Sequence, residues 1–362
     1  MPQPQDLVTL GFSPSPGYIE VNTASQVPST FVVRSGQVFY IKETKLFYIG
    51  DGVTQFSSLT TVGNTIGSGG ASSVQLGLNA AATNADTIAI GQGTTATAGG
   101  SISLGRSSVA SGNSSIAIGY NAASASGTAS IAIGTGSSAP QVNAIAIGAS
   151  STSTGGGNTI AIGASSSANG TASVAIGNAS SATSINTVAL GAGTAANASD
   201  STASGLQAVN AKPYTFGYCS GIITVNSDAM AYLCTAGIQT TTASLTEIQI
   251  GAARGTAYPL NVASGRVLAF KIAITAIRTD VSGTCAAWPH IVGAVARDAT
   301  GNCRFLGAVV GAGTTTLADA GAATWSVSLT ADTVNNRIAI GVTGEAAKTI
   351  KWLARIEFSE GY

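Results

Sequence analysis

The chain has 362 residues, enough for two or three domains of ordinary size. Only 8% of them are charged, the 15 basic and 15 acidic residues cancel, and glycine reaches 46 residues. This neutral, charge-poor composition excludes the basic surface of a nucleic-acid-binding protein, so we expect no nucleic-acid partner. No apolar run reaches the length of a membrane helix, so we expect no membrane insertion.

Residues 1–70 are predicted to form a particle-attachment segment and a small β module. Residues 1–28 are polar and proline-rich, which favours an extended peptide, and we expect no secretory signal in them. Strands are expected at residues 30–34, 37–42 and 45–49. The run from Lys45 to Leu59 is similar to a short module near the N-terminus of many phage tail fibres. This resemblance implies attachment to a phage tail or baseplate protein.

A 14-residue repeat dominates residues 71–206. Its mark is the motif aliphatic-x-aliphatic-Gly, and in seven of nine copies an alanine follows the glycine by five residues. Self-similarity at a fixed period indicates coils that stack into a solenoid. The structural glycines of the repeat are Gly77, Gly91, Gly105, Gly119, Gly134, Gly148, Gly163, Gly177 and Gly191.

Each repeat predicts one coil of a parallel β-roll. Ile116 and Ile118 are two residues apart, so they project from one side of a short strand, with Ala117 on the other side. We expect the isoleucines to fill the narrow interior. Gly119 then supplies the backbone freedom for a tight corner, and the later alanine marks a second, thinner strand.

A single roll of this width buries little apolar area for the backbone that it orders, which predicts association between chains. From residue 74 to residue 205 only Asp86, Arg106 and Asp200 carry a charge at neutral pH. Three rolls can therefore pack side by side along their alanine and serine faces. We expect a homotrimer.

The repeat carries a resemblance to a known family. The segment from Ser115 to Gly134 resembles the YadA-type head repeat of trimeric autotransporter adhesins, which also occurs in bacteriophage tail fibres. The resemblance covers about a third of the chain. It implies a left-handed parallel β-roll within an intertwined trimer.

Residues 207–362 are predicted to form a separate antiparallel β-sandwich that resembles a jelly roll. Segments of strand length run apolar or alternate, with turn residues between them. The stretch from Val342 to Phe358 resembles the C-terminal domain of phage tail fibre and tail spike proteins. The expected fold class is therefore all-β, with a trimeric roll as a shaft between two β domains. The expected strands are residues 268–277, 292–297, 304–310, 325–329, 337–342 and 349–358.

Aromatic side chains are candidate receptor contacts because they stack on sugar rings. Alternation around Trp325 and Trp352 places both rings in the core. Trp288 is followed by a proline that interrupts the strand, so Trp288 and the nearby His290 are predicted loop residues that contact a receptor. Tyr258, also before a proline, is a third candidate. A half-buried anchor is the alternative interpretation of Trp288.

The four cysteines are separated by 15, 51 and 18 residues, which fits neither a zinc site nor a redox Cys-x-x-Cys pair. Four free, buried thiols are expected, with a Cys285–Cys303 disulfide as the alternative. We expect no metal and no cofactor.

The sequence offers no catalytic pattern. It has a single histidine, and its carboxylates are scattered through predicted turns and solvent-facing strand positions. We therefore expect that the protein is not an enzyme. We expect a phage tail fibre that is assembled in the host cytoplasm, is carried on the virion and binds a host-surface receptor. A glycan is the expected receptor and a protein the alternative. The rival hypotheses are a bacterial trimeric surface adhesin, which requires export and a membrane anchor, and a glycan-degrading tail spike.

Overall fold

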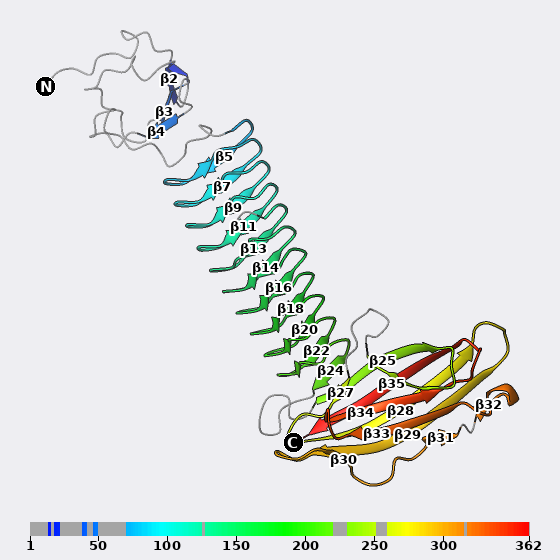
Figure 1. Ribbon diagram of the computed structural model, residues 1–362. Coiled ribbons are helices and arrows are strands. Elements are labelled where there is room, and N and C mark those ends of the chain that lie inside the picture. The colour runs from blue at the N-terminus through cyan, green and yellow to red at the C-terminus, as the bar shows by residue number, and fades with distance from the viewer. Residues whose placement is uncertain are drawn as a thin grey trace. The chain divides into compact units, whose positions relative to one another are not determined.

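The computed structural model describes residues 70–124, 127–219, 230–250, 259–314 and 317–361, and the backbone of four short strands before residue 50. The chain divides into two compact units, Met1–Ser165 and Ser166–Tyr362. All regular structure in the described part is β-strand, except for one 3-10 turn, η5, at Ala320–Ala322. The predicted all-β class is confirmed, with a parallel β-roll and antiparallel C-terminal sheets (Figure 1). The predicted domain boundaries stay a prediction.

Four short strands form a sheet near the N-terminus, in the order β1 (Pro14–Ser15), β2 (Tyr18–Val21), β3 (Val38–Ile41) and β4 (Leu46–Ile49). The antiparallel pair β3–β4 lies within two of the predicted strands. Strand β2, which runs parallel to β3, occupies a segment that was expected to be an extended peptide. The third predicted strand, at residues 30–34, falls outside the described residues.

In the unit Met1–Ser165 the repeat forms the rungs of a parallel roll. The aliphatic-x-aliphatic segment is the longer strand of each rung and pairs with its copy in the next rung, as Ile116 does with Ile131 and Ile118 with Ile133. The longer strands are β5 (Val74–Leu76), β7 (Ile88–Ile90), β9 (Ile102–Leu104), β11 (Ile116–Ile118), β13 (Ile131–Ile133), β14 (Ile145–Ile147) and β16 (Ile160–Ile162). The predicted thinner strands are β6 (Ala81–Ala82), β8 (Thr95–Ala96), β10 (Val109–Ala110), β12 (Ala123–Ser124) and β15 (Thr152–Ser153).

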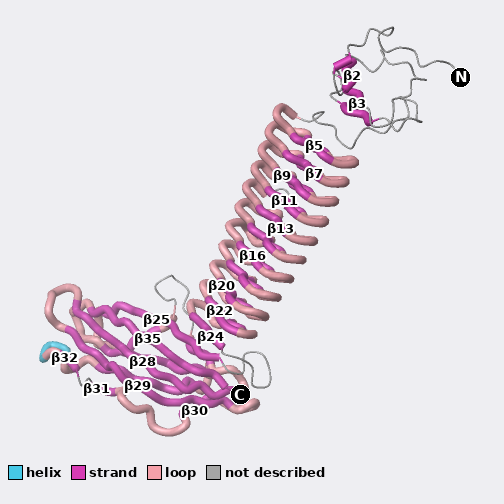
Figure 2. The backbone as a smooth tube through the Cα atoms, turned by 180° about the vertical axis from the view of Figure 1, so that it is seen from behind, coloured by secondary structure: helices cyan, strands magenta, loops and turns pink. Residues whose placement is uncertain are grey.

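The unit Ser166–Tyr362 begins with rungs of the same kind (Figure 2). Its longer strands are β18 (Val174–Ile176), β20 (Val188–Leu190), β22 (Thr202–Gly205) and β24 (Phe216–Cys219). Its thinner strands are β17 (Ser167–Ala168), β19 (Ser181–Ala182), β21 (Ala195–Ala196) and β23 (Val209–Asn210).

The predicted direction of the repeat's side chains is wrong. Ala117 is fully buried inside its coil, whereas Ile116 and Ile118 on either side of it are half-buried on the outer face. Alanine, serine and threonine fill the interior, and their hydroxyls bond back to the coil, as Ser137 Oγ does when it donates to the Gly134 carbonyl at 3.0 Å. A coil of this circumference is too narrow for isoleucine. The alanine and serine faces are therefore interior and not free for packing between chains.

The glycine of each repeat turns the corner that the sequence predicts. All nine motif glycines have φ between +116° and +136°, a region that side chains disfavour. The corners also stack closely, because a Cβ added to Gly119 lies 2.8 Å from the carbonyl oxygen of Gly134 in the next rung. Glycine is needed here for backbone conformation and for space.

Strand β24 joins the roll to the C-terminal sheets. Phe216 pairs in parallel with Thr202 of β22 and in antiparallel with β25 (Met230–Thr240). The Asn210 amide fills the interior of the last coil and donates to the carbonyls of Thr202, at 2.8 Å, and Thr215, at 3.0 Å. Strand β25, which was not predicted, thus covers the edge of the parallel sheet and prevents open-edge pairing there.

Two antiparallel sheets face each other in the C-terminal part. The larger sheet holds β25 and β35 (Ile350–Gly361), followed by β28 (Arg266–Arg278), β29 (Cys285–Arg297), β30 (Cys303–Phe305) and β32 (Leu317–Ala318). The smaller sheet is β26 (Leu245–Ile248), β34 (Arg337–Thr343), β33 (Ser326–Asp332) and β31 (Gly313–Thr314), with β27 (Leu260–Asn261) also on β34.

Tryptophan packing fills the space between these sheets. Trp325 and Trp352 are buried, as predicted, and their ring centroids lie 5.9 Å apart. Of the predicted free thiols, Cys219, Cys234 and Cys303 are buried and Cys285 is exposed, so full burial was wrong for Cys285. Burial raises the pKa of Cys234 to about 12, which keeps that thiol protonated and inert.

Candidate functional site

A shallow hollow opens on the outer face of the larger sheet. It lies at the end of the sheet that carries β32, which Figure 2 labels. It has a volume of about 880 Å³. One cross-strand row of its lining consists of Leu353, Thr275, Ala287 and Leu317, which are paired neighbours on β35, β28, β29 and β32. Because paired residues project from the same face, this row forms one continuous, mostly apolar floor.

The next row toward the strand ends consists of Lys351, Ile277, Cys285 and Asp319. It places an ammonium group at one end and a carboxylate at the other, with an apolar side chain between them. Ile277 is 53%, Leu353 55% and Leu317 57% exposed, so three large aliphatic side chains meet solvent together. We call the depression formed by these two rows the hollow.

Asp319 is held in place by the start of β29. Its Oδ2 accepts hydrogen bonds from the Cys285 backbone N–H at 2.8 Å and from Cys285 Sγ at 3.1 Å. These bonds lower the pKa of Asp319 and raise the pKa of Cys285. The carboxylate is therefore ionised at neutral pH and can only accept hydrogen bonds, while the thiol is a poor nucleophile.

Trp288 does not lie in a loop. It belongs to β29 and is 2% exposed, with Nε1 donating to the Gly313 carbonyl at 3.1 Å and its ring 5.6 Å from that of Trp352. The proline after Trp288 is accommodated where the β28–β29 register shifts, between Ile272 and Ile274. The Trp288 ring therefore packs on the buried face of the larger sheet, where a receptor in solvent cannot contact it.

The other two predicted contacts are not brought together with Trp288. His290 is exposed on β29 but does not line the hollow. Tyr258 lies outside the described residues. None of the residues that line the hollow was predicted as a receptor contact, because the two rows of the hollow combine residues of four strands that are distant in sequence.

A second notable surface is apolar and runs along the rungs. In each unit, the outward side chains of the longer rung strands form a ladder that we call the aliphatic stripe. The stripe of Met1–Ser165 runs from Val74 to Ile162. That of Ser166–Tyr362 begins at Val174, is interrupted by Thr202 and Ser204, and ends on the rings of Phe216 and Tyr218. Exposed fractions of 40% for Ile176 and 51% for Tyr218 show that the stripe is incompletely covered in one chain.

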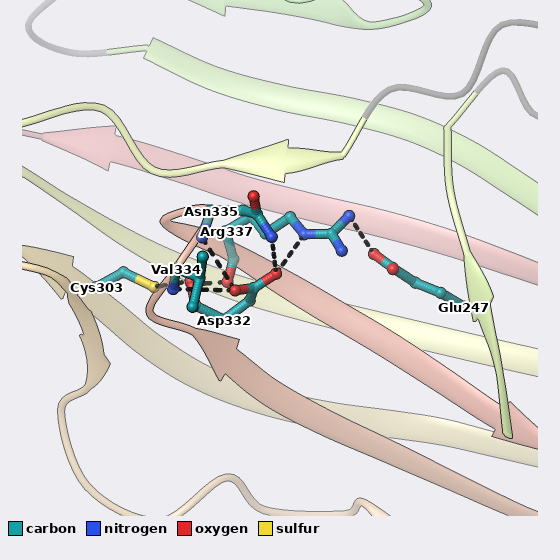
Figure 3. A network of polar contacts seen from close by, with 6 residues as sticks. All are labelled: Glu247, Cys303, Asp332, Val334, Asn335 and Arg337. Carbon is teal, nitrogen blue, oxygen red and sulfur yellow. Dashed lines mark hydrogen bonds and ion pairs between the residues drawn. The ribbon is translucent and has the colours of Figure 1, made fainter.

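Two carboxylates approach one guanidinium in the smaller sheet (Figure 3). Arg337 contacts Asp332 through Nε and Glu247 through Nη1, each at 2.8 Å. Bonds from Arg337, and then from Asn335, hold the pKa of Asp332 well below its usual range. A carboxylate held ionised in this way cannot act as a general acid, and the cluster ties the β33–β34 hairpin to β26.

Neither a metal centre nor a membrane helix is found in the described part of the chain. None of its clusters gathers three or more metal-ligating His, Cys, Asp or Glu side chains. The described segments also contain no apolar helix of the length that a bilayer requires.

Comparison with known proteins identifies the repeat. Residues 96–122, 125–151 and 155–180 match the YadA head domain repeat. No curated protein matches the chain. The tailspike protein of the Acinetobacter phage vB_ApiP_P1 is similar over 77% of this chain and 49% of its own, so this chain spans about half of that structure. At 11% identity and a TM-score of 0.17, this likeness carries no argument about fold or function.

Proposed function

We propose that this chain is a fibre-forming attachment protein that acts as a homotrimer. The observation that carries this proposal is the YadA head repeat, built here as stacked rungs with an aliphatic stripe on their outer face. A long ladder of half-exposed isoleucines is unusual on the surface of a monomer and fits an assembly surface. The resemblance to trimeric adhesins supports an assembly of three chains.

The finer assignment is a bacteriophage tail fibre. The similarity of residues 45–59 to an N-terminal tail-fibre module supports it, with the first 70 residues joined to a phage tail or baseplate protein. Such a protein is assembled in the host cytoplasm and carried on the virion. Its C-terminal unit binds the host surface, where a glycan is the expected receptor and a protein receptor is the alternative.

The protein acts by binding and not by catalysis. The carboxylates that come together at Arg337 are engaged in ion pairs, which supports a structural role for them. Two rival functions make different predictions. A glycan-degrading tail spike releases new reducing ends from host polysaccharide, and a bacterial trimeric adhesin is recovered from the outer membrane of the cell that makes it.

Cell attachment is the direct test. Fluorescently labelled full-length protein is incubated with a panel of bacterial strains, and bound label is measured before and after periodate oxidation of surface glycans. We expect the label to bind some of the strains and to be lost from them after periodate oxidation. Label that resists periodate but is lost after surface proteolysis identifies a protein receptor. The absence of label on every strain, or a single-chain mass by light scattering, contradicts the proposal.

A further inference from the structure

We propose that the hollow on the larger sheet is the receptor subsite and takes a saccharide that presents methyl groups, as 6-deoxyhexoses and N-acetylhexosamines do. This inference rests on the proposed attachment function and names the ligand class of its C-terminal unit. Four observations carry it: the hollow's separation from the aliphatic stripe, its floor, its rim and the absence of an accessible aromatic ring among its lining residues.

The hollow lies away from the surface assigned to assembly. Phe216, at the end of the stripe, pairs with Leu233 of β25, and the two rows of the hollow begin opposite Gly237 and Gln239 on that same strand. Strand rise places them about 13 to 20 Å from Leu233. Within this unit, the stripe and the hollow are therefore made of different side chains.

The floor of the hollow is aliphatic and half-exposed. Leu353, Leu317 and Ile277 present branched side chains, and Thr275 and Ala287 leave space between them. Its volume of about 880 Å³ falls within the usual range for ligand sites, which are mostly apolar with a few polar groups. Burial of one methyl group on such a floor contributes about a fourfold gain in affinity.

The rim supplies polar groups at both ends. Asp319 and Lys351 are separated by three strand spacings, or about 14 Å, which is long enough for a short oligosaccharide. Asp319 Oδ2 is fixed by Cys285, and Oδ1 accepts no hydrogen bond from the described residues, so it is available to sugar hydroxyls. Lys351 is exposed and can donate to sugar oxygens or pair with an acidic sugar.

The lining distinguishes among sugars. Plain hexoses are often held by stacking their C–H face on an exposed aromatic ring. The aromatic residue of this lining is Trp352, which is 2% exposed and lies beneath the floor. Aliphatic side chains match a methyl group better than a sugar ring, which favours the methyl-bearing class. In a trimer three such hollows act together, so weak single contacts suffice for attachment.

Binding of defined oligosaccharides tests this inference. Wild-type full-length protein is passed over immobilised oligomers of rhamnose, of N-acetylglucosamine and of glucose. We expect at least tenfold tighter binding to one or both methyl-bearing oligomers than to glucose. Tighter binding to the rhamnose oligomer alone identifies a 6-deoxy sugar as the ligand. Tighter binding to the N-acetylglucosamine oligomer alone identifies the acetamide methyl group as the recognised feature. Equal or tighter binding to glucose overturns the proposal.

Substitutions locate the site. Leu353→Gln and Asp319→Asn are each expected to weaken binding at least tenfold at unchanged trimer mass. The control is Leu245→Gln, which changes a leucine that is 66% exposed on the smaller sheet and is expected to leave binding unchanged. Equal loss in the control variant contradicts the assignment of the site.

The outcomes separate this inference from the attachment function. If labelled protein coats bacteria but binds none of the oligomers, the ligand assignment is wrong and attachment stands. If it coats no strain, attachment itself is wrong. If Leu353→Gln lowers the oligomeric mass, the hollow is a contact between copies of the chain and the saccharide proposal is overturned.

Discussion

Substitution of one corner glycine tests how the roll is built. In Gly134→Ala the new Cβ lies 2.5 Å from the carbonyl oxygen of Gly148, closer than real Cβ contacts, and φ is +129°. A side chain at this φ costs about 1 to 3 kcal/mol, and the close contact forces a shift of the rung backbone. We therefore expect a total loss of about 3 kcal/mol or more per chain.

Gly99→Ala is the matched control in the same roll. No atom lies within 4 Å of a Cβ built on Gly99, and its φ is not in the left-handed region. Because alanine restricts the unfolded chain more than glycine does, this change is expected to be neutral or to stabilise by up to about 1 kcal/mol.

Thermal unfolding at one scan rate, combined with hydrogen exchange of the β13 and β14 amides, measures both variants. A fixed scan rate is needed because large assemblies often unfold irreversibly. We expect a lower transition temperature and faster exchange for Gly134→Ala alone. Equal effects in the two variants, or none in Gly134→Ala, refute the argument from close rung stacking.

Three further changes probe the stripe, the turns and the hairpin. Ile133→Ser removes an outward aliphatic side chain of the stripe and leaves the coil interior unchanged, so sedimentation is expected to show a shift from the proposed trimer toward monomer, with lower strand content at low chain concentration. Ala172→Asn is expected to stabilise by about 1 kcal/mol in thermal unfolding, since Ala172 has φ +54° and Asn186 sits at the same turn position in the next rung. Arg337 lowers the pKa of Asp332, so their ion pair stabilises the hairpin fully above the ordinary carboxyl pKa of 3.8 and loses that contribution as pH falls below it. Hydrogen exchange of the hairpin amides, corrected for intrinsic rate, is expected to rise below pH 4, and this pH dependence is expected to vanish in Asp332→Asn.

The rung architecture was predictable because its cause is local. A glycine every 14 residues specifies a corner, and two aliphatic residues spaced two apart specify a short strand. Neither signal depends on the rest of the chain. Local sequence does not decide which face of that strand points into the coil. Alternation separates Ala117 from Ile116 and Ile118, but the width of the coil decides that alanine is interior.

The C-terminal part was predicted less completely. Residues 230–234 are all apolar, a run of strand length that indicates β25, although β25 was not among the expected strands. Trp288 was misplaced because a following proline usually ends a strand, and here a register shift accommodates it. The hollow was beyond prediction, since its rows exist only when β35, β28, β29 and β32 pair.

In the proposed trimer, the outward direction of the isoleucines couples folding to assembly. A coil with alanine inside leaves much of its aliphatic area in solvent until another chain covers the stripe, at roughly 25 cal/mol per Å² of apolar surface buried. The stability of the roll is then inseparable from chain concentration. The C-terminal sheets end the roll through β24, and the hollow and the stripe consist of different side chains, so the proposed assembly and the proposed ligand binding can be tested separately. We therefore expect variants of the stripe to lower both the oligomeric mass and the binding to cells, and variants of the hollow to lower the binding alone.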